Sequence, residues 1–231
     1  QERQVDGQRV LRLESSGLQV DVAPAVGGRI ISLRDRVSGH EFLWRNTALR
    51  LEQLPAGSPY DPNFYGGIDE LIPNDMPESI NGLDEPDHGE LWTTSLDASV
   101  EQDELVLTGR LPVSGLHYER RMRLDAQTPR VDFHYRIHNP TRHRRDFMWQ
   151  LHPALAIAPG DVIECPARKA RAVDPRWSRW TSTEPFDWPS VEGQRADIIP
   201  PRDVTMDFLC RSERDRGEIG WRRPATGLGL T

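Results

Sequence analysis

Residues 131–139, VDFHYRIHN, alternate between apolar and polar side chains more regularly than any other stretch of the chain. One face of an extended segment would carry Val131, Phe133, Tyr135 and Ile137. The opposite face would carry Asp132, His134, Arg136 and His138. A period of two residues is typical of a β-strand that buries one face and exposes the other. We therefore predict a strand over this stretch.

Similar strand-like segments recur along the chain, at 18–24, 104–113, 116–125, 146–157, 203–210, 217–222 and 227–231. Dipeptides that favour turns separate them, namely Gly27-Gly28, Ser38-Gly39, Ser114-Gly115, Asn139-Pro140 and Pro159-Gly160. No segment has the long apolar stripe of an amphipathic helix. We therefore predict an all-β sandwich or barrel. Because there is no repeat and no low-complexity linker, we expect a single domain over residues 1–231.

The composition argues against several classes of partner. The 231 residues are 36% hydrophobic and 28% charged, with a formal net charge of −7. This acidic balance argues against nucleic acid or an anionic membrane as a partner. No apolar run approaches the roughly 20 residues of a membrane-spanning helix.

Nucleotide-binding, zinc-hydrolase and serine-hydrolase motifs are missing from the sequence, so we expect no cofactor and no metal. The two cysteines, Cys165 and Cys210, allow one disulfide but do not predict a thiolate metal site. The cellular compartment is left open, with a soluble, cytoplasmic location favoured.

Residues 55–92 and 166–201 lack periodicity and are expected to form long loops, which are often functional. The first contains GGIDELIPND (66–75), where the carboxylates of Asp69, Glu70 and Asp75 cluster. These groups could hydrogen-bond the hydroxyls of a sugar, or they could cap the loop.

The same loop contains DHGELW (87–92). Gly89 allows a tight turn and the close approach of a ligand to His88. His88 could instead be a solvent-exposed turn histidine. Trp92 could be a stacking platform for a sugar or a core residue.

Residues 149–157, WQLHPALAI, place a histidine in an apolar strand. Gln150 and His152 would share a small, polar face suited to the floor of a groove, while Phe147, Trp149 and Leu151 would form a bulky face that packs. Pro153 cannot donate to a sheet ladder, which indicates an edge or a bulge beside the histidine. The alternative is a core histidine satisfied by one hydrogen bond.

Other basic residues are interpreted more simply. His134 and His138 lie four residues apart on one strand face, about 13 Å along the strand, which is too far for one metal ion. With Arg136 between them they are expected on a solvated face. The run TRHRR (141–145) is expected to be a solvated hairpin tip, and an anion site there is the alternative.

The order of these pieces resembles that of the galactose mutarotase-like (aldose 1-epimerase) superfamily. LQVDVAPAVGGRIISLRDRVSGHEFLW (18–44) resembles its opening strands, and GGIDELIPND and DHGELW resemble its next two landmarks. The segment from Leu116 to Ile157 resembles its central meander, ending in a strand that carries a histidine before a proline. The resemblance covers most of residues 17–165.

This resemblance implies a large antiparallel β-sandwich that binds a monosaccharide or sugar derivative and interconverts its anomers. By carry-over, His152 would be the general acid that protonates the ring oxygen, and His88 would bind and polarise the same region of the sugar. A carboxylate would remove the proton of the anomeric hydroxyl. Glu70, Asp75, Gln150 and Trp92 are the expected substrate-binding residues.

The sequence departs from the family pattern at its end. The family's catalytic glutamate lies on a late strand, and GWRRPATGLGLT (220–231) resembles the strand before it. We therefore expect the C-terminal strands to be missing from this sequence, with Glu164 and Asp207 as candidate substitutes. Two alternatives stay open: a non-catalytic carbohydrate-binding sandwich, and the supporting domain of a polysaccharide-active enzyme.

Overall fold

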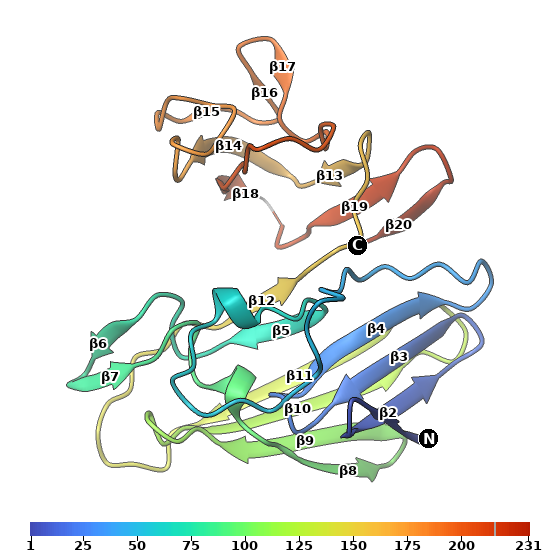
Figure 1. The fold of residues 1–231 in the computed structure, drawn as a ribbon, viewed down its shortest axis with the longest axis vertical. Coiled ribbons are helices and arrows are strands. Elements are labelled where there is room, and N and C mark those ends of the chain that lie inside the picture. Colours follow the sequence, from blue (N-terminus) through green and yellow to red (C-terminus); the bar gives the residue numbers. More distant parts are fainter. Residues whose placement is uncertain (215) are drawn as a thin grey trace. The chain divides into compact units, whose positions relative to one another are not determined.

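The computed structural model describes residues 1–214 and 216–231, and its regular elements are almost all antiparallel β-strands (Figure 1). The helical elements of this described part are two short 3-10 helices, η1 (Asp61–Asn63) and η2 (Leu91–Thr93). The all-β prediction is confirmed.

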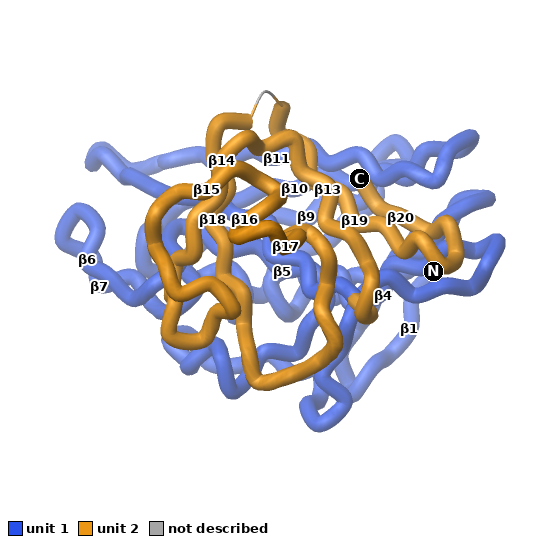
Figure 2. Tube along the Cα trace, turned by 90° about the horizontal axis from the view of Figure 1, so that it is seen from above, with its two compact units in different colours: residues 1–156 blue, residues 157–231 orange. Residues whose placement is uncertain are grey.

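The chain divides into two compact units, Gln1–Ala156 and Ile157–Thr231, which Figure 2 distinguishes by colour. The first will be called unit 1 and the second unit 2. The expectation of one domain over the whole chain stays a prediction.

Unit 1 contains two antiparallel sheets and one hairpin. The six-stranded sheet has the order β1 (Glu2–Val5), β2 (Gln8–Glu14), β3 (Leu18–Ala23), β4 (Arg29–Asp35), β5 (Ile68–Leu71) and β12 (Gln150–Pro153). The four-stranded sheet has the order β11 (Val131–His138), β10 (His117–Leu124), β9 (Glu104–Arg110) and β8 (Asp97–Glu101). The hairpin pairs β6 (Glu78–Ile80) with β7 (Leu83–Glu85).

Unit 2 is built from smaller sheets. One has the order β13 (Val162–Glu164), β19 (Gly220–Arg223) and β20 (Leu228–Leu230), and another the order β15 (Phe186–Asp187), β14 (Ala167–Ala172) and β18 (Leu209–Arg214). A hairpin pairs β16 (Ser190–Val191) with β17 (Gln194–Arg195). Cys165 and Cys210 are both free thiols, so the disulfide that the sequence allows is not formed.

The two sheets of unit 1 bury their facing sides against each other. The apolar side chains on these sides include Val20 and Val22 of the larger sheet and Leu105, Leu107 and Met122 of the smaller one. This alternation of buried and exposed residues is the reason why the longer strands were predictable. Arg120, which interrupts the apolar face of its strand, is also buried on that side.

Short strands escaped the sequence analysis. The presumed loops 55–92 and 166–201 contain β5 to β7 and β14 to β17, so the loop predictions are wrong there. Most of these strands have two to four residues, too few for a periodic pattern. Strand β14 is longer, but its sequence ARKARA contains no β-branched or aromatic residue.

The segment predicted at 146–157 forms a much shorter strand, β12, at the edge of the six-stranded sheet. The edge position agrees with the inference from Pro153, whose missing N–H is tolerated there. The predicted packing of the bulky face is wrong for Leu151, which is 44% exposed, and for Phe147, which also reaches the surface. Trp149 is partly exposed but packs on Tyr135, with ring centroids 4.8 Å apart.

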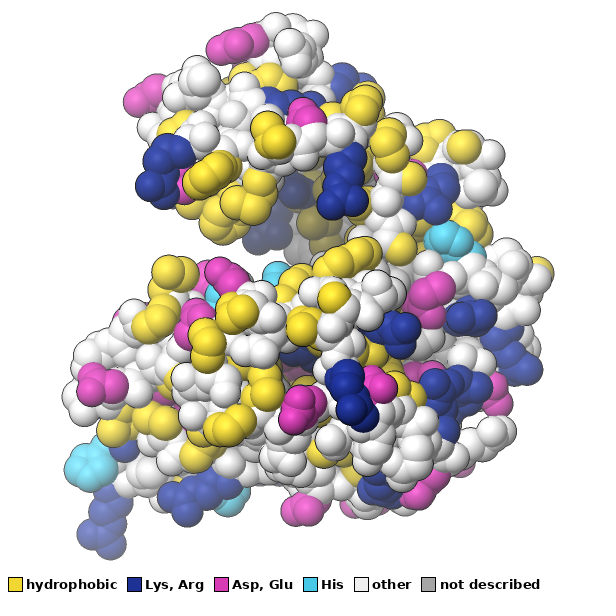
Figure 3. Space-filling model, viewed as in Figure 1, with side chains coloured by type: hydrophobic (Ala, Val, Ile, Leu, Met, Phe, Trp, Pro, Cys, Tyr) yellow, Lys and Arg dark blue, Asp and Glu magenta, His cyan; other side chains and the backbone are white. Residues whose placement is uncertain are grey.

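Apolar side chains lie on the surface among charged ones, as Figure 3 shows for one face of the molecule. Of the helices in the described part of the chain, none is long and apolar enough to cross a membrane.

Candidate functional site

Tyr60 lies at the centre of an aromatic cluster in unit 1. Its ring stacks on the imidazole of His88, with centroids 3.8 Å apart, and meets the Trp92 ring edge-on at 5.2 Å. The imidazole of His152 has its centroid 6.0 Å from that of Tyr60 and 6.3 Å from that of His88. The two histidines singled out in the sequence therefore share one site.

Strand pairing places His152 beside a carboxylate. His152 on β12 lies directly opposite Asp69 on β5, and its Nδ1 is 3.2 Å from Oδ1 of Asp69. The hydroxyl of Tyr60 lies 2.9 Å from the same Nδ1 and 2.6 Å from Oδ2 of Asp69.

These contacts determine which nitrogen of His152 carries a proton. An ionised carboxylate only accepts hydrogen bonds, so the Tyr60 hydroxyl donates its hydrogen to Asp69. Both neighbours of Nδ1 are then acceptors, and Nδ1 of His152 must be the donor. The side chain is 41% exposed, and Nε2 is the nitrogen left for a ligand.

The charge of Asp69 is secured by a buried cation. Burial raises the pKa of Asp69, but the Arg29 charge and the hydrogen bonds from His152 and Tyr60 outweigh it and lower the pKa below its ordinary value. An Arg29 guanidinium nitrogen lies 2.7 Å from Oδ2 of Asp69, and both side chains are buried. Burial, followed by the charge of Asp69, raises the pKa of Tyr60 far above its ordinary value. At neutral pH the carboxylate is therefore ionised and the phenol protonated.

His88 is held in the same way by a different aspartate. Its Nδ1 is 2.8 Å from Oδ1 of Asp87, whose Oδ2 accepts the backbone N–H of Tyr60 at 3.0 Å. Burial raises the pKa of Asp87, while the hydrogen bonds from Tyr60 and His88 lower it, and the net shift is downward. Nε2 of His88 faces Asp75, with Oδ1 at 3.8 Å. The side chain is only 17% exposed, so the alternative of a solvent-exposed turn histidine is wrong.

The backbone around His88 explains why a glycine follows it. His88 and Gly89 both adopt left-handed conformations, with φ of 58° and 73°. The turn lies against the chain after β5, because the His88 N–H donates to the Asp75 carbonyl at 2.7 Å. A Cβ on Gly89 would lie 2.3 Å from the carbonyl oxygen of Ile72. Only glycine fits this position without moving backbone.

Glu70 does not join this site, because adjacent residues of a strand point to opposite faces. Its carboxylate is buried in the sandwich and accepts hydrogen bonds from four side chains: Tyr118 at 2.7 Å, Arg120 at 2.8 Å, Trp149 at 3.0 Å and Tyr135 at 3.2 Å. With its oxygens engaged in this way, Glu70 connects the two sheets, and we leave it out of the proposed ligand contacts.

The other predicted ligand contacts differ in their surroundings. Trp92 is buried and its Nε1–H donates to the Asp87 carbonyl at 3.1 Å, so it supports the site from below the surface. Gln150 lies two residues before His152 on β12, with its amide nitrogen 3.1 Å from the Met148 sulfur. Asp75 is partly exposed beside His88.

An aromatic wall continues from His152 toward solvent. The Phe64 ring stacks on the His152 ring with centroids 5.4 Å apart, and Trp44 follows at 5.9 Å from Phe64. Trp44 is exposed, while Tyr60, whose ring centroid lies 5.5 Å from that of Phe64, is buried. A ligand at Nε2 of His152 would therefore meet apolar ring surface as well as polar groups.

Sequence reasoning missed Tyr60, Arg29 and Asp87. Arg29 was detectable in principle, since a charged residue opens the apolar run of β4. The sequence around Tyr60 carries no comparable signal, because its role arises from contacts with residues that are distant in the chain.

The candidate carboxylates Glu164 and Asp207 are engaged within unit 2. Glu164 accepts from Nε of Arg222 at 2.8 Å, and Asp207 forms an ion pair with Arg179. Within residues 1–214 and 216–231, no three His, Cys, Asp or Glu side chains are grouped so that they could hold a metal ion.

Comparison with known proteins identifies the fold. No protein-family model and no curated protein matches the sequence. Among solved structures, one described as a "Putative aldose 1-epimerase" from Escherichia coli K12 has a TM-score of 0.61 at 17% identity, covering 94% of this chain and 74% of that one. A galactose mutarotase-like protein from Clostridium acetobutylicum has a TM-score of 0.60 at 16% identity, covering 84% and 65%.

A TPR-domain containing protein from Parabacteroides distasonis is equally similar, with a TM-score of 0.61 at 19% identity over 93% of this chain. The present chain spans 32% of the length of that protein. The chain thus has the fold of a galactose mutarotase-like antiparallel β-sandwich.

Proposed function

We propose that the protein binds a monosaccharide or sugar derivative and interconverts its anomers as an aldose 1-epimerase-like isomerase. One observation carries the proposal: His88 and His152 are close together, and each has its Nδ1 on an aspartate. Aspartates in these positions orient the rings and leave the Nε2 atoms for a ligand. Fold neighbours described as an epimerase and as mutarotase-like support the same class of substrate.

The reaction requires the transfer of one proton to the sugar and of another proton from it. His152, in its protonated form, would deliver a proton from Nε2 to the ring oxygen as the bond from that oxygen to the anomeric carbon breaks. A carboxylate would take the proton of the anomeric hydroxyl, which leaves an aldehyde. Rotation of the aldehyde followed by the reverse steps gives the other anomer. Each positioned acid or base contributes on the order of 10²–10⁴ in rate.

Other residues of the site would bind the sugar. His88 would hydrogen-bond the same region of the ring, and Asp75 beside it would accept from a hydroxyl. The rings of Phe64 and Trp44 would cover an apolar face of the sugar.

The test is the equilibration of a freshly dissolved pure anomer, followed by polarimetry or NMR. The proposal predicts that the protein accelerates equilibration of at least one aldose or sugar phosphate above the buffer rate. Acceleration that is absent for a panel of common aldoses and their phosphates would reject the enzymatic function.

A non-catalytic sugar-binding site is the second candidate. It is favoured by the fact that Asp69 and Asp87 already accept hydrogen bonds from Tyr60 and the two imidazoles. Sugar binding measured by calorimetry, with no change in the rate of anomer exchange, would select this alternative.

A further inference from the structure

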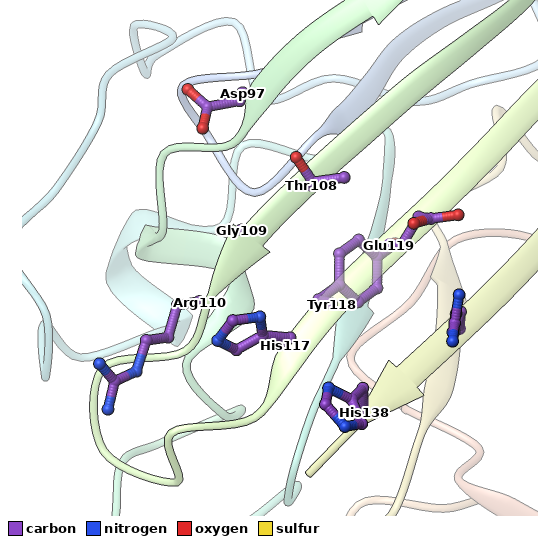
Figure 4. A pocket seen from close by; sticks show the side chains of 9 residues that line it. Asp97, Thr108, Gly109, Arg110, His117, Tyr118, Glu119 and His138 are labelled. Carbon is purple, nitrogen blue, oxygen red and sulfur yellow. The ribbon is translucent and has the colours of Figure 1, made fainter. Parts of the chain in front are cut away.

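The four-stranded sheet of unit 1 carries a second candidate site on its outer face, away from the sandwich core. A pocket of about 470 Å³ lies there, within the size range of small-molecule sites. Its lining comes from all four strands: Asp97, Thr108, Gly109, Arg110, His117, Tyr118, Glu119, Arg136 and His138 (Figure 4). This outer pocket shares no residue with the cluster around Tyr60.

Strand register aligns cationic and imidazole side chains across the pocket. His117 on β10 lies directly opposite Arg110 on β9 and opposite His138 on β11, and Figure 4 shows its ring between those two side chains. The rings of His117 and His138 meet edge-on with centroids 6.1 Å apart. Arg136 lies two residues before His138 on the same face of β11, opposite Glu119. Three neighbouring strands thus contribute basic groups to one end of the face.

The two arginines of the pocket differ from other arginines on the same face in their ion pairing. Among the residues that the structure describes, Arg121 and Arg123 form salt bridges, whereas Arg110 and Arg136 form none. Glu119, the carboxylate opposite Arg136, instead accepts from Nε of Arg121 at 2.9 Å. Arg121 also pairs with Glu101 at 3.1 Å. The nearby carboxylates of Glu119 and Glu101 are therefore engaged by Arg121, and Asp97 is the remaining carboxylate of the lining.

The guanidinium and imidazole groups of the outer pocket are hydrogen-bond donors on three neighbouring strands. An anion between the strands would accept hydrogen bonds from these groups and would balance the charge of the two arginines.

A basic loop borders the same end of the sheet. Nε of Arg145 donates to the Ser114 carbonyl at 3.0 Å, in the turn that joins β9 to β10. The run 141–145 is mostly exposed, as predicted, but it is not a hairpin tip, because it joins β11 to β12 of the other sheet. It adds positive charge beside the outer pocket, which increases the local concentration of anions.

We propose that the outer pocket binds a small oxyanion, either a phosphate or sulfate group or a carboxylate, through Arg110, Arg136, His117 and His138. The other charged groups that face the two histidines are Arg110, Arg136, Glu119 and Asp97.

The test is titration of the full chain with inorganic sulfate at pH 6, followed by calorimetry or by NMR shifts of the histidine rings. The proposal predicts saturable binding. Arg110→Gln and Arg136→Gln should each weaken this binding about tenfold, and His117→Gln with His138→Gln should weaken it as well.

The matched control is Arg123→Gln, on the same outer face of β10 but beside Asp132 at 4.0 Å. It should leave sulfate binding unchanged, and circular dichroism should show that all the variants are folded. Parallel titrations with phosphate and acetate distinguish a tetrahedral anion from a carboxylate as the preferred ligand. The absence of saturable binding of all three anions at pH 6, or an equal loss in Arg123→Gln, would overturn the proposal.

Discussion

His88 and His152 have ring centroids 6.3 Å apart, although one lies in a left-handed turn after β7 and the other on the edge strand β12. Tyr60 connects their supports. Its backbone N–H donates to Asp87, which holds His88, and its hydroxyl donates to Asp69, which holds His152. A change at Tyr60 should therefore affect both imidazoles.

The first prediction concerns the proposed acid. His152→Ala should lower the rate of anomer exchange by about 10²–10⁴ if that histidine delivers the proton. Stability should change little, because the ring is partly exposed. His134→Ala, on the exposed face of β11, is the matched control and should retain full activity. An unchanged rate in His152→Ala, measured by polarimetry, would reject the role of this residue.

The second prediction treats Tyr60 as a positioning residue. Tyr60→Phe keeps the stack on His88 but removes the hydroxyl shared with Asp69 and His152, which should cost about 1 kcal/mol of unfolding free energy. Activity should fall less than in His152→Ala, since Asp69 still accepts from Nδ1.

The pH profile of the Tyr60→Phe rate should also shift, because the hydrogen bonding of the acid has changed. Tyr135→Phe removes a buried hydroxyl that donates to Glu70, outside the site. It should cost similar stability without shifting the profile. Identical profiles for wild type and Tyr60→Phe would contradict the positioning role.

A third prediction follows from the backbone at Gly89. Gly89→Ala places a Cβ 2.3 Å from the Ile72 carbonyl, so the turn must move and take His88 with it. Gly82→Ala imposes the same left-handed strain, at φ of 77°, with nothing within 4 Å of the new Cβ. Chemical denaturation should show a larger loss of unfolding free energy for Gly89→Ala. Sugar affinity, measured by calorimetry, should fall only in that variant. Equal effects of the two substitutions would refute the close approach.

The fourth prediction separates Glu70 from Asp75. Glu70→Gln leaves the charge of the buried Arg120 uncompensated, which should cost about 3–5 kcal/mol in urea unfolding. Asp75→Asn is partly exposed and should change stability by less than about 0.5 kcal/mol. Sugar affinity, measured by calorimetry, should weaken in Asp75→Asn. A stable Glu70→Gln protein with weakened sugar binding would reverse the two roles.

The fifth prediction concerns a buried pair of carboxylates, Glu85 and Glu90. Burial, and then the neighbouring Glu90, raise the pKa of Glu85 to about 7. The unfolded chain releases this proton at the ordinary pKa of a glutamate, so between that pKa and about 7 the folded state binds more protons. The raised pKa therefore stabilises the folded state fully at pH values below the ordinary pKa of a glutamate, and this stabilisation is lost as the pH rises to about 7.

Glu85→Gln should therefore reduce the fall in unfolding free energy between pH 5 and pH 8. Urea titrations of the two proteins at both pH values measure the difference. Glu52→Gln changes an exposed glutamate outside this pair and serves as the control. The same pH dependence in wild type and Glu85→Gln would contradict the raised pKa.

Much of the fold was predictable because the long strands of unit 1 have one buried face. Strands β3, β9, β10 and β11 lie within the segments expected at 18–24, 104–113, 116–125 and 131–139. His88 and His152 were also selected from the sequence, His152 because it interrupts an apolar strand and His88 because a glycine follows it in the loop 55–92. The short strands and the packing of Leu151 were not predictable, as too few residues were available to show a period.

The sequence by itself determined that alternating strands would form an antiparallel sandwich, because side-chain periodicity is a local property of each segment. Only the tertiary structure decided that Asp69 supports His152 while its neighbour Glu70 is buried against Arg120. Two adjacent carboxylates point to opposite faces of β5, and which face meets a histidine depends on the register of β12 and on the packing of the second sheet. These are long-range contacts, and no local pattern specifies them.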